Sequence, residues 1–171
     1  MTQKHTSKDT SINSTKLPAI FGKLRPEDVT GAAVIDFGAG RYTDHIAARV
    51  DALGAAEYYP YDPYNQPEPV NDLAALAMAD VITCSNVLNV VDSDEAIYTA
   101  VEWMTAHLLP GGRIFCTVYT GDGTCHGKET QKGQSWQRNA PLADYVRFFR
   151  ALDLQTKITR GMIIATLPEV I

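Results

Sequence analysis

The chain has 171 residues, 45% of them hydrophobic and 20% charged, with a formal net charge of −5. This length usually forms one domain, and this composition excludes a disordered, collagen-like or coiled-coil protein. The three cysteines are too few and too widely spaced for a disulfide framework or a CxxC zinc site, so we expect no metal. The sequence has neither a signal peptide nor an apolar run of membrane-spanning length, so we expect a cytoplasmic protein without membrane contact.

The charge is unevenly distributed along the chain. Residues 1–33 carry five basic and three acidic side chains, residues 34–102 two and twelve, and residues 103–171 eight and five. Solvated helix faces explain most such distributions. A functional interpretation is an acidic half that binds a cationic or hydroxyl-rich ligand, beside a basic half that meets an anion.

The hydrophobic pattern predicts alternating strands and helices. Polar residues 1–15 are expected to form a disordered tail before a single domain over 16–171. Short apolar runs between turn residues predict strands, and amphipathic spacing predicts helices. In chain order we expect a short lead-in helix over 17–24, a strand over 32–37, a helix over 43–53, a strand over 56–61, a helical stretch over 72–78, a strand over 80–85, a helix over 93–108, a strand over 113–119, a polar loop over 120–139, a helix over 141–152, and strands over 155–159 and 162–167.

This order of elements predicts an α/β fold with a doubly wound, mostly parallel sheet of about six strands. The last two strands are separated only by Arg160 and Gly161, so they must form an antiparallel hairpin. Asp62 and Asp80 are too close in sequence for a helix, a strand and a second helix. The third strand of the sheet is therefore expected to be abbreviated or missing. In such sheets the ligand lies beyond the carboxyl ends of the strands.

A glycine-rich turn follows the first predicted strand. Gly38 and Gly40 allow the backbone to turn sharply and to approach a ligand closely. Asp62 lies at the end of the second predicted strand, where a carboxylate accepts hydrogen bonds from a ribose. Together they predict a site for an adenosine-containing cofactor. The alternative is that Asp62 only forms an Asx-type turn.

The chain resembles class I S-adenosylmethionine-dependent methyltransferases. The resemblance covers residues 16–168 and rests on Asp36-x-Gly38-x-Gly40, on Asp62, on the segment DVITCSNVL at 80–88 and on LPGG at 109–112. More narrowly, the segments at 61–64 and 86–90 resemble small methyltransferases of phages and DNA-modification loci. The resemblance implies a Rossmann-like methyltransferase sheet with a reversed last strand, and S-adenosylmethionine as the cofactor.

The resemblance also implies roles for individual residues. The methionine part of the cofactor would lie on Gly38, Ala39 and Gly40, with Asp36 bracing the loop; Asp62 would bind both ribose hydroxyls; Tyr61 or Tyr64 would pack on the adenine; and Ser85 and Asn86 would face the sulfonium and the methyl group. Tyr42 stands where this family usually has a third glycine, and the NAD-dependent dehydrogenase fingerprint is less well matched because its third glycine is also absent. The missing third strand removes a segment that commonly contacts the adenine amine.

The long loop over 120–139 is the predicted acceptor side. Loops of this length are usually functional or disordered. The candidate substrate-binding residues are Lys128, Lys132, Trp136 and Arg138, and the candidate catalytic residues are Asn86, Asn89 and His126. Simpler interpretations are a solvated His126, a Trp136 that anchors the loop, and an Asn89 that caps a turn.

The predicted function is S-adenosylmethionine-dependent methyl transfer to an unidentified acceptor, with nucleic acid as one candidate. The basic loop and the phage-like segments favour nucleic acid, whereas the absence of an Asp-Pro-Pro-Tyr type motif after Ser85 weighs against it. The alternative function is a catalytically silent cofactor-binding module, or a partner subunit of a modification system. Homo-oligomerisation is left open.

Overall fold

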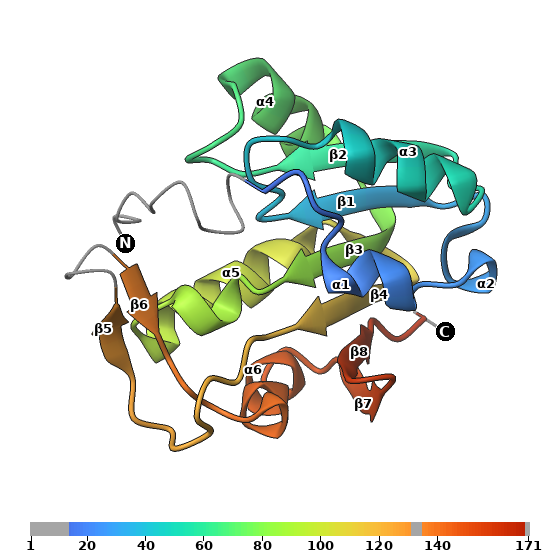
Figure 1. Cartoon of the computed structure of the whole chain (residues 1–171). Coiled ribbons are helices and arrows are strands. Elements are labelled where there is room, and N and C mark those ends of the chain that lie inside the picture. Colours follow the sequence, from blue (N-terminus) through green and yellow to red (C-terminus); the bar gives the residue numbers. More distant parts are fainter. Residues whose placement is uncertain (1–13, 131–134, 170–171) are drawn as a thin grey trace.

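The computed structural model describes residues 14–130 and 135–169. A six-stranded sheet with strand order β2-β1-β3-β4-β8-β7 forms its centre, and β5 and β6 form a separate two-stranded sheet (Figure 1). The strands are β1 (Ala33–Phe37), β2 (Glu57–Tyr61), β3 (Ala79–Ser85), β4 (Leu108–Thr117), β5 (Lys128–Thr130), β6 (Ser135–Gln137), β7 (Gln155–Thr159) and β8 (Met162–Thr166). The helices are α1 (Ala19–Lys23), α2 (Pro26–Val29), α3 (Asp44–Ala52), α4 (Glu68–Leu76), α5 (Asp94–Ala106) and α6 (Val146–Arg150), with 3-10 turns η2 (Leu88–Val90) and η3 (Leu142–Tyr145).

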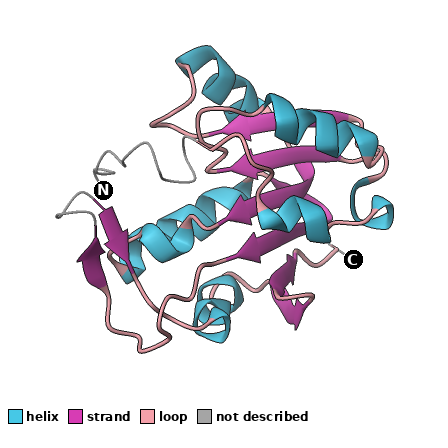
Figure 2. Cartoon of the chain, in the orientation of Figure 1, coloured by secondary structure: helices cyan, strands magenta, loops and turns pink. Residues whose placement is uncertain are grey.

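The sheet confirms the predicted fold class. β2, β1, β3 and β4 are parallel, and β8 is antiparallel to both of its neighbours. Residues 63–78 contain α4 but no strand, so the third strand is missing, as the short spacing predicts. The carboxyl ends of β1, β2, β3 and β4 therefore meet at one edge of the sheet (Figure 2).

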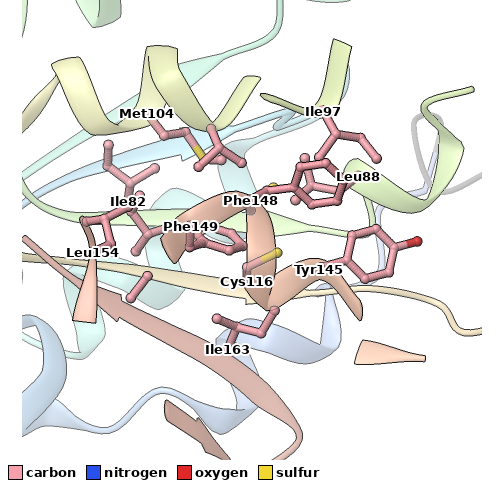
Figure 3. Close-up of a cluster of buried hydrophobic side chains, with 14 of the residues drawn as sticks. Ile82, Leu88, Ile97, Met104, Cys116, Tyr145, Phe148, Phe149, Leu154 and Ile163 are labelled. Carbon is pink, nitrogen blue, oxygen red and sulfur yellow. The ribbon is translucent and has the colours of Figure 1, made fainter. Parts of the chain in front are cut away.

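Two hydrophobic clusters cover the two faces of the sheet. On one face, Ile46 and Val50 of α3 pack with Ile20 and Phe21 of α1. On the other face, α5 and α6 cover strands β1, β3, β4 and β8, and Figure 3 shows side chains of this cluster. Alternate residues of each central strand face opposite clusters, as Val34 and Ile35 do, because successive strand side chains point to opposite faces. The sheet that carries the site is thus fixed from both sides.

Helix α4 lies beside the outer edge of β2 (Figure 1), on the side where a third strand would pair. The side chain of Asn71 pairs with the backbone of Asp62 as a neighbouring strand would: its Oδ1 accepts from the Asp62 amide at 2.8 Å, and its Nδ2 donates to the Asp62 carbonyl at 3.1 Å. The backbone carbonyl of Tyr61 points to β1, because it accepts from the Gly38 amide. The backbone groups of successive strand residues point to opposite sides, so those of Pro60 face away from β1. At the outer edge of β2, Pro60 therefore has no backbone N–H to donate, and the backbone groups of Asp62 are already paired with Asn71.

Several predicted boundaries differ from the structure. The helix expected over 72–78 begins at Glu68, after a Pro-containing turn, and β4 begins at Leu108 because Leu108 pairs with Ala79 across a bulge. The helix expected over 141–152 is divided into η3 and α6. No described helix is long and apolar enough to cross a membrane.

The loop expected over 120–139 is the largest difference. It contains the antiparallel hairpin β5–β6, in which Glu129 pairs with Trp136. Three-residue strands within a polar, glycine-rich segment carry too short a hydrophobic pattern for recognition from sequence. The predicted tail over 1–15 lies outside the described residues except for its last two positions, and Lys132 also lies outside them.

Candidate cofactor and acceptor site

The turn after β1 is held by the strand ends around it. Gly38 and Gly40 have φ values of 77° and 75°, which favour glycine. The amides of Gly38 and Ala39 donate to the Tyr61 carbonyl at 2.8 and 3.2 Å. A Cβ atom on Gly38 would lie 2.2 Å from Cγ2 of Val87, so the turn packs directly on the segment that follows β3. The predicted glycine turn is therefore a tightly packed cradle at the carboxyl edge of the sheet.

The Asp62 carboxylate organises this cradle. Its Oδ2 accepts from the Gly40 amide at 3.0 Å, and its Oδ1 accepts from the amides of Tyr64 and Asn65 at 3.0 and 3.1 Å. The side-chain Nδ2 of Asn65 donates to both carboxylate oxygens at 3.0 Å. Asp62 is 5% exposed. The Asx-type turn is thus present, and ribose hydroxyls would have to replace the Asn65 amide at this carboxylate.

Asp36 does not brace the glycine loop as the resemblance implies. Its Oδ1 accepts from Thr83 Oγ1 at 2.7 Å, and its Oδ2 accepts from the Tyr58 hydroxyl at 3.1 Å. The carboxylate therefore ties β1 to β3 and β2 beneath the loop. Burial raises the pKa of Asp36 to about 6, although both hydrogen bonds oppose the shift. With this pKa, Asp36 changes its protonation state near pH 6.

Tyr61 packs within an aromatic cluster rather than alone at the sheet edge. Its ring stacks on Trp103 of α5 with centroids 4.1 Å apart, and on Phe37 with centroids 5.6 Å apart. Trp103 in turn stacks on His107 at 3.8 Å. One face of Tyr61 is therefore covered by Trp103. Tyr64 is 54% exposed in the turn after β2.

Ser85 and Asn86 lie at the end of β3, against the end of β4. The hydroxyls of Ser85 and Thr117 are 3.4 Å apart, and the Asn86 amide donates to the Thr117 carbonyl at 2.9 Å. Asn86 has a φ of 56°, a left-handed conformation uncommon outside glycine. Such conformations persist where the surrounding structure enforces them, often at functional sites. These side chains lie one strand away from the glycine cradle.

Asn89 is buried, and its side chain forms hydrogen bonds within the fold. It is 3% exposed; its Nδ2 donates to Gln137 Oε1 at 3.2 Å, and its Oδ1 accepts from the Tyr119 amide at 3.3 Å. Gln137 Nε2 donates to the Tyr119 carbonyl at 2.9 Å, and the Arg138 amide donates to the Asn89 carbonyl at 2.8 Å. Asn89 thus fastens β6 to η2 and to the end of β4. Both polar atoms of its side chain are occupied, so a catalytic role is not supported.

Among the described contacts of His126 and Trp136, none is with Ser85 or Asn86. His126 is exposed, and its backbone carbonyl accepts from Asn139 Nδ2 at 2.9 Å. A Cβ atom on Gly127 would lie 2.2 Å from Cζ2 of Trp136, so the indole packs on the backbone just before β5. Trp136 therefore packs within its own loop, and its role in substrate binding stays a prediction.

Two predicted cations of the hairpin are already paired. Lys128 Nζ lies 3.6 Å from Asp122 Oδ2, and both side chains are largely exposed. Arg138 forms a salt bridge with Asp94 at the start of α5, and its side chain is only 19% exposed. Asp94 also accepts from Arg147 Nη2 at 2.7 Å. The positive charge predicted for this wall is therefore partly neutralised, by Asp122 of the same loop and by Asp94 of α5.

Sequence reasoning missed three residues that shape the site. Gln66 Nε2 donates to the Gly40 carbonyl at 2.6 Å and closes the glycine turn, Asn65 holds Asp62, and Thr117 holds Asn86. Thr117 could have been found as the polar residue that ends a predicted buried strand. No local pattern signals Gln66, because its partner Gly40 lies in another turn, whereas Asn65 lies in the same turn as Asp62.

The comparisons with known proteins agree with this geometry. A family model described as a methyltransferase domain matches residues 11–157. A comparison with curated protein sequences found no match. Among solved structures, a Burkholderia thailandensis 1,6-didemethyltoxoflavin-N1-methyltransferase with bound 1,6-didemethyltoxoflavin and S-adenosylhomocysteine has a TM-score of 0.69 at 18% identity, over 95% of this chain and 80% of that one.

Two further solved structures have the same fold. Streptomyces venezuelae DesVI has a TM-score of 0.58 at 11% identity, over 84% of this chain and 86% of that one. The sugar N-methyltransferase KedS8 from a Streptoalloteichus species has a TM-score of 0.58 at 15% identity, over 88% and 84%. Similarity to phage or DNA-modification enzymes is not among these findings.

The reversed last strand, the glycine cradle and the acid after β2 define the class of Rossmann-like, S-adenosylmethionine-dependent methyltransferases. The chain belongs to the methyltransferase domain family. Its residues fit the cofactor of that class, because the Gly40 end of the turn carries no side chain and the Asp62 carboxylate lies beside it at the carboxyl edge of the sheet. S-adenosylmethionine is therefore its methyl donor.

Proposed function

We propose that this methyltransferase acts on a small-molecule acceptor held between the ends of β3 and β4 and the β5–β6 hairpin. The observation that carries the proposal is the polar group at these strand ends: the Ser85 and Thr117 hydroxyls 3.4 Å apart, beside the left-handed Asn86. It lies next to the glycine cradle, where a donor and an acceptor can be brought together. Methyl transfer from a sulfonium depends chiefly on such positioning, which supplies about 7–11 kcal/mol in well-oriented reactions.

The donor side is formed by the chain's own backbone and carboxylate. S-adenosylmethionine supplies a methyl group bound to a positively charged sulfur. We assign Gly38, Ala39 and Gly40 to its methionine part and Asp62 to its ribose. Tyr64, exposed in the adjoining turn, is assigned to the adenine in preference to Tyr61, which Trp103 covers.

On the acceptor side, Asn86 and Ser85 orient the acceptor atom toward the methyl group. Asn86 offers a carboxamide, which can donate or accept a hydrogen bond, and Ser85 and Thr117 offer hydroxyls. No described side chain near them is arranged as a strong base: Asn89 is a buried amide and His126 lies on the exposed hairpin side. The acceptor should therefore be a group, such as an amine, that needs orientation more than deprotonation.

A small molecule is favoured over nucleic acid by the pairing of the hairpin cations. Arg138 is bound to Asp94, and Lys128 lies near Asp122. Arg138 is largely buried and Lys128 is paired at the surface, so an extended polyanion would meet little accessible positive charge on the described part of the hairpin. The bound 1,6-didemethyltoxoflavin of the Burkholderia enzyme and the sugar acceptor class named for KedS8 support the same conclusion.

The donor side is tested by calorimetry with S-adenosylmethionine and, separately, with NAD. We expect S-adenosylmethionine alone to bind. Asp62→Ala should weaken binding by about 1.5–3 kcal/mol, as expected for lost hydrogen bonds to a carboxylate. Asn65→Ala should instead tighten binding, by up to about 1 kcal/mol, because it frees the carboxylate from an internal partner. Binding of NAD alone would overturn the assignment, and weaker binding by Asn65→Ala would show that the turn itself is needed.

The acceptor side is tested by a salt titration. Binding of a single-stranded or duplex oligonucleotide is measured from low to high salt, for the wild type and for a variant with Lys128, Lys132 and Arg138 replaced together. If the acceptor is a small molecule, we expect weak oligonucleotide binding whose salt slope barely depends on the three cations. Tight binding with a slope that falls in the variant would restore nucleic acid as the acceptor.

A further inference from the structure

A cavity of about 190 Å³ lies between the exit of the hairpin and the start of α6. It is lined by Cys125, by Arg138 and Ala140, and by four residues of η3 and α6. Cys125 approaches the backbone beyond the hairpin: its amide donates to the Asn139 carbonyl at 2.9 Å. Whole small-molecule sites are usually larger, about 300–1,000 Å³, so this cavity suits one polar group of a ligand.

Tyr145 is one of the residues that line this cavity, and its hydroxyl is buried without a hydrogen-bond partner among the described residues. Tyr145 is 1% exposed, and in Figure 3 its hydroxyl points away from the packed side chains of Phe149 and Cys116. Burial raises its pKa to about 12, with the charge of Arg138 opposing the shift. Buried hydroxyls nearly always have a partner, and an unpaired one carries an unfavourable free energy. A ligand atom that accepts a hydrogen bond would remove this penalty.

Two guanidinium groups line the same cavity. Arg138 and Arg147 share one carboxylate, Asp94, and each uses a single nitrogen, Nη2, for it. Each guanidinium has five N–H donors, so most of them remain available. Both groups lie over the Phe148 ring, at 5.9 and 4.7 Å from its centroid, and this contact holds them in place.

One acidic side chain, Asp144, also lines the cavity. The thiol of Cys125 donates to Asp144 Oδ2 at 3.2 Å. Counting the side chains that line the cavity, the donors from Tyr145, Arg138 and Arg147 outnumber the acceptors. A group rich in acceptor oxygens, matched to guanidinium forks, is therefore the complementary ligand.

We propose that this cavity binds an oxyanion, a carboxylate or phosphate group of a small molecule, through the Tyr145 hydroxyl and the guanidinium groups of Arg138 and Arg147. The cavity adjoins the acceptor side, since the Arg138 amide donates to the carbonyl of Asn89, three residues beyond Asn86. The identification of this oxyanion as the anchoring group of the methyl acceptor rests on the proposed function. The binding site itself does not.

The experiment titrates the ¹⁵N-labelled protein with sodium acetate, with inorganic phosphate and with sodium chloride, following the backbone amides of Cys125 and Ala140 by NMR. We expect saturable shifts with one of the two oxyanions and not with chloride, and the responding anion distinguishes a carboxylate from a phosphate site. Tyr145→Phe should weaken that binding roughly tenfold or more, since it removes a hydrogen bond to a charged group. Tyr98→Phe, an exposed tyrosine of α5, is the matched control and should leave binding unchanged.

A second measurement separates a ligand site from a structural one. Thermal unfolding without added anion should show Tyr145→Phe as stable as the wild type or more so, because the hydroxyl it removes has no partner. A lower unfolding temperature with unchanged anion affinity would mean that the hydroxyl serves the fold, and would overturn the proposal, as would the absence of saturable shifts. Calorimetry with S-adenosylmethionine on the same samples keeps the two proposals apart: anion binding without cofactor binding would overturn only the proposed function.

Discussion

The donor side and the acceptor side of the site are built in different ways. The donor side consists of the ends of adjacent parallel strands, fixed by backbone hydrogen bonds from Gly38 and Ala39 to Tyr61 and by close packing of Gly38 on Val87. The acceptor side is a short hairpin outside the central sheet, fastened by side chains, chiefly Asn89 and Gln137. The first is rigid because the sheet is rigid. The second depends on a few polar contacts, which can be altered singly.

The largest expected effect is on the donor side. Gly38→Ala places a Cβ 2.2 Å from Val87 Cγ2 at a φ of 77°. Left-handed strain of about 1–2 kcal/mol and overpacking of about 1–3 kcal/mol add to a loss of roughly 4 kcal/mol in unfolding free energy. Urea unfolding and calorimetry with S-adenosylmethionine measure the loss of stability and of cofactor binding.

Gly123→Ala is the matched control on the acceptor side. It has a similar φ of 69° but no atom within 4 Å of the added Cβ, so only the strain remains. Adding Val87→Ala to Gly38→Ala should restore part of the stability by relieving the contact. Equal losses in Gly38→Ala and Gly123→Ala would show that packing on Val87 does not distinguish the two sides.

The next effect is a pH dependence of the unfolding free energy, caused by Asp36 on the donor side. The pKa of Asp36 is raised from 3.8 to about 6, so the folded state binds this proton more tightly than the unfolded state. The resulting stabilisation is complete below pH 3.8 and is lost as the pH rises through 6. Asp36→Asn keeps the shape without the charge, so its unfolding free energy relative to that of the wild type should rise by about 2 kcal/mol between pH 4 and pH 7. Urea unfolding at both pH values measures this gain; a constant difference would mean that Asp36 is ionised in the fold throughout.

The smallest of these effects is on the acceptor side. Asn89→Ala leaves Gln137 and the Tyr119 amide without their partner, which should lower the unfolding free energy by about 1–3 kcal/mol. Hydrogen exchange of the β6 amides should accelerate, because the hairpin loses its main attachment. Cofactor affinity should stay within twofold of the wild type. A large loss of S-adenosylmethionine binding would contradict the separation of the two sides.

The same division explains what the sequence could predict. The strands of the central sheet, the reversed hairpin and the absent third strand follow from apolar runs and from the short spacing between Asp62 and Asp80, both of which are local patterns. The glycine turn is equally local. The hydrogen bonds that set the roles of Asp36, Asn89 and Arg138 join each of them to partners more than twenty residues away. Such pairings depend on the packed fold, so the sequence does not reveal the partners of these three side chains.

The free edge of the sheet has a consequence for the behaviour of the protein at high concentration. Without a third strand, the aromatic segment Glu57–Tyr61 is an edge to which the strand of another molecule could add. Pro60 offers no donor on the outer side, and Asn71 occupies both backbone groups of Asp62. Together they deny an incoming strand a continuous ladder of hydrogen bonds. The sheet thus has one strand fewer, yet its β2 edge is poorly suited to pairing with the strand of another molecule.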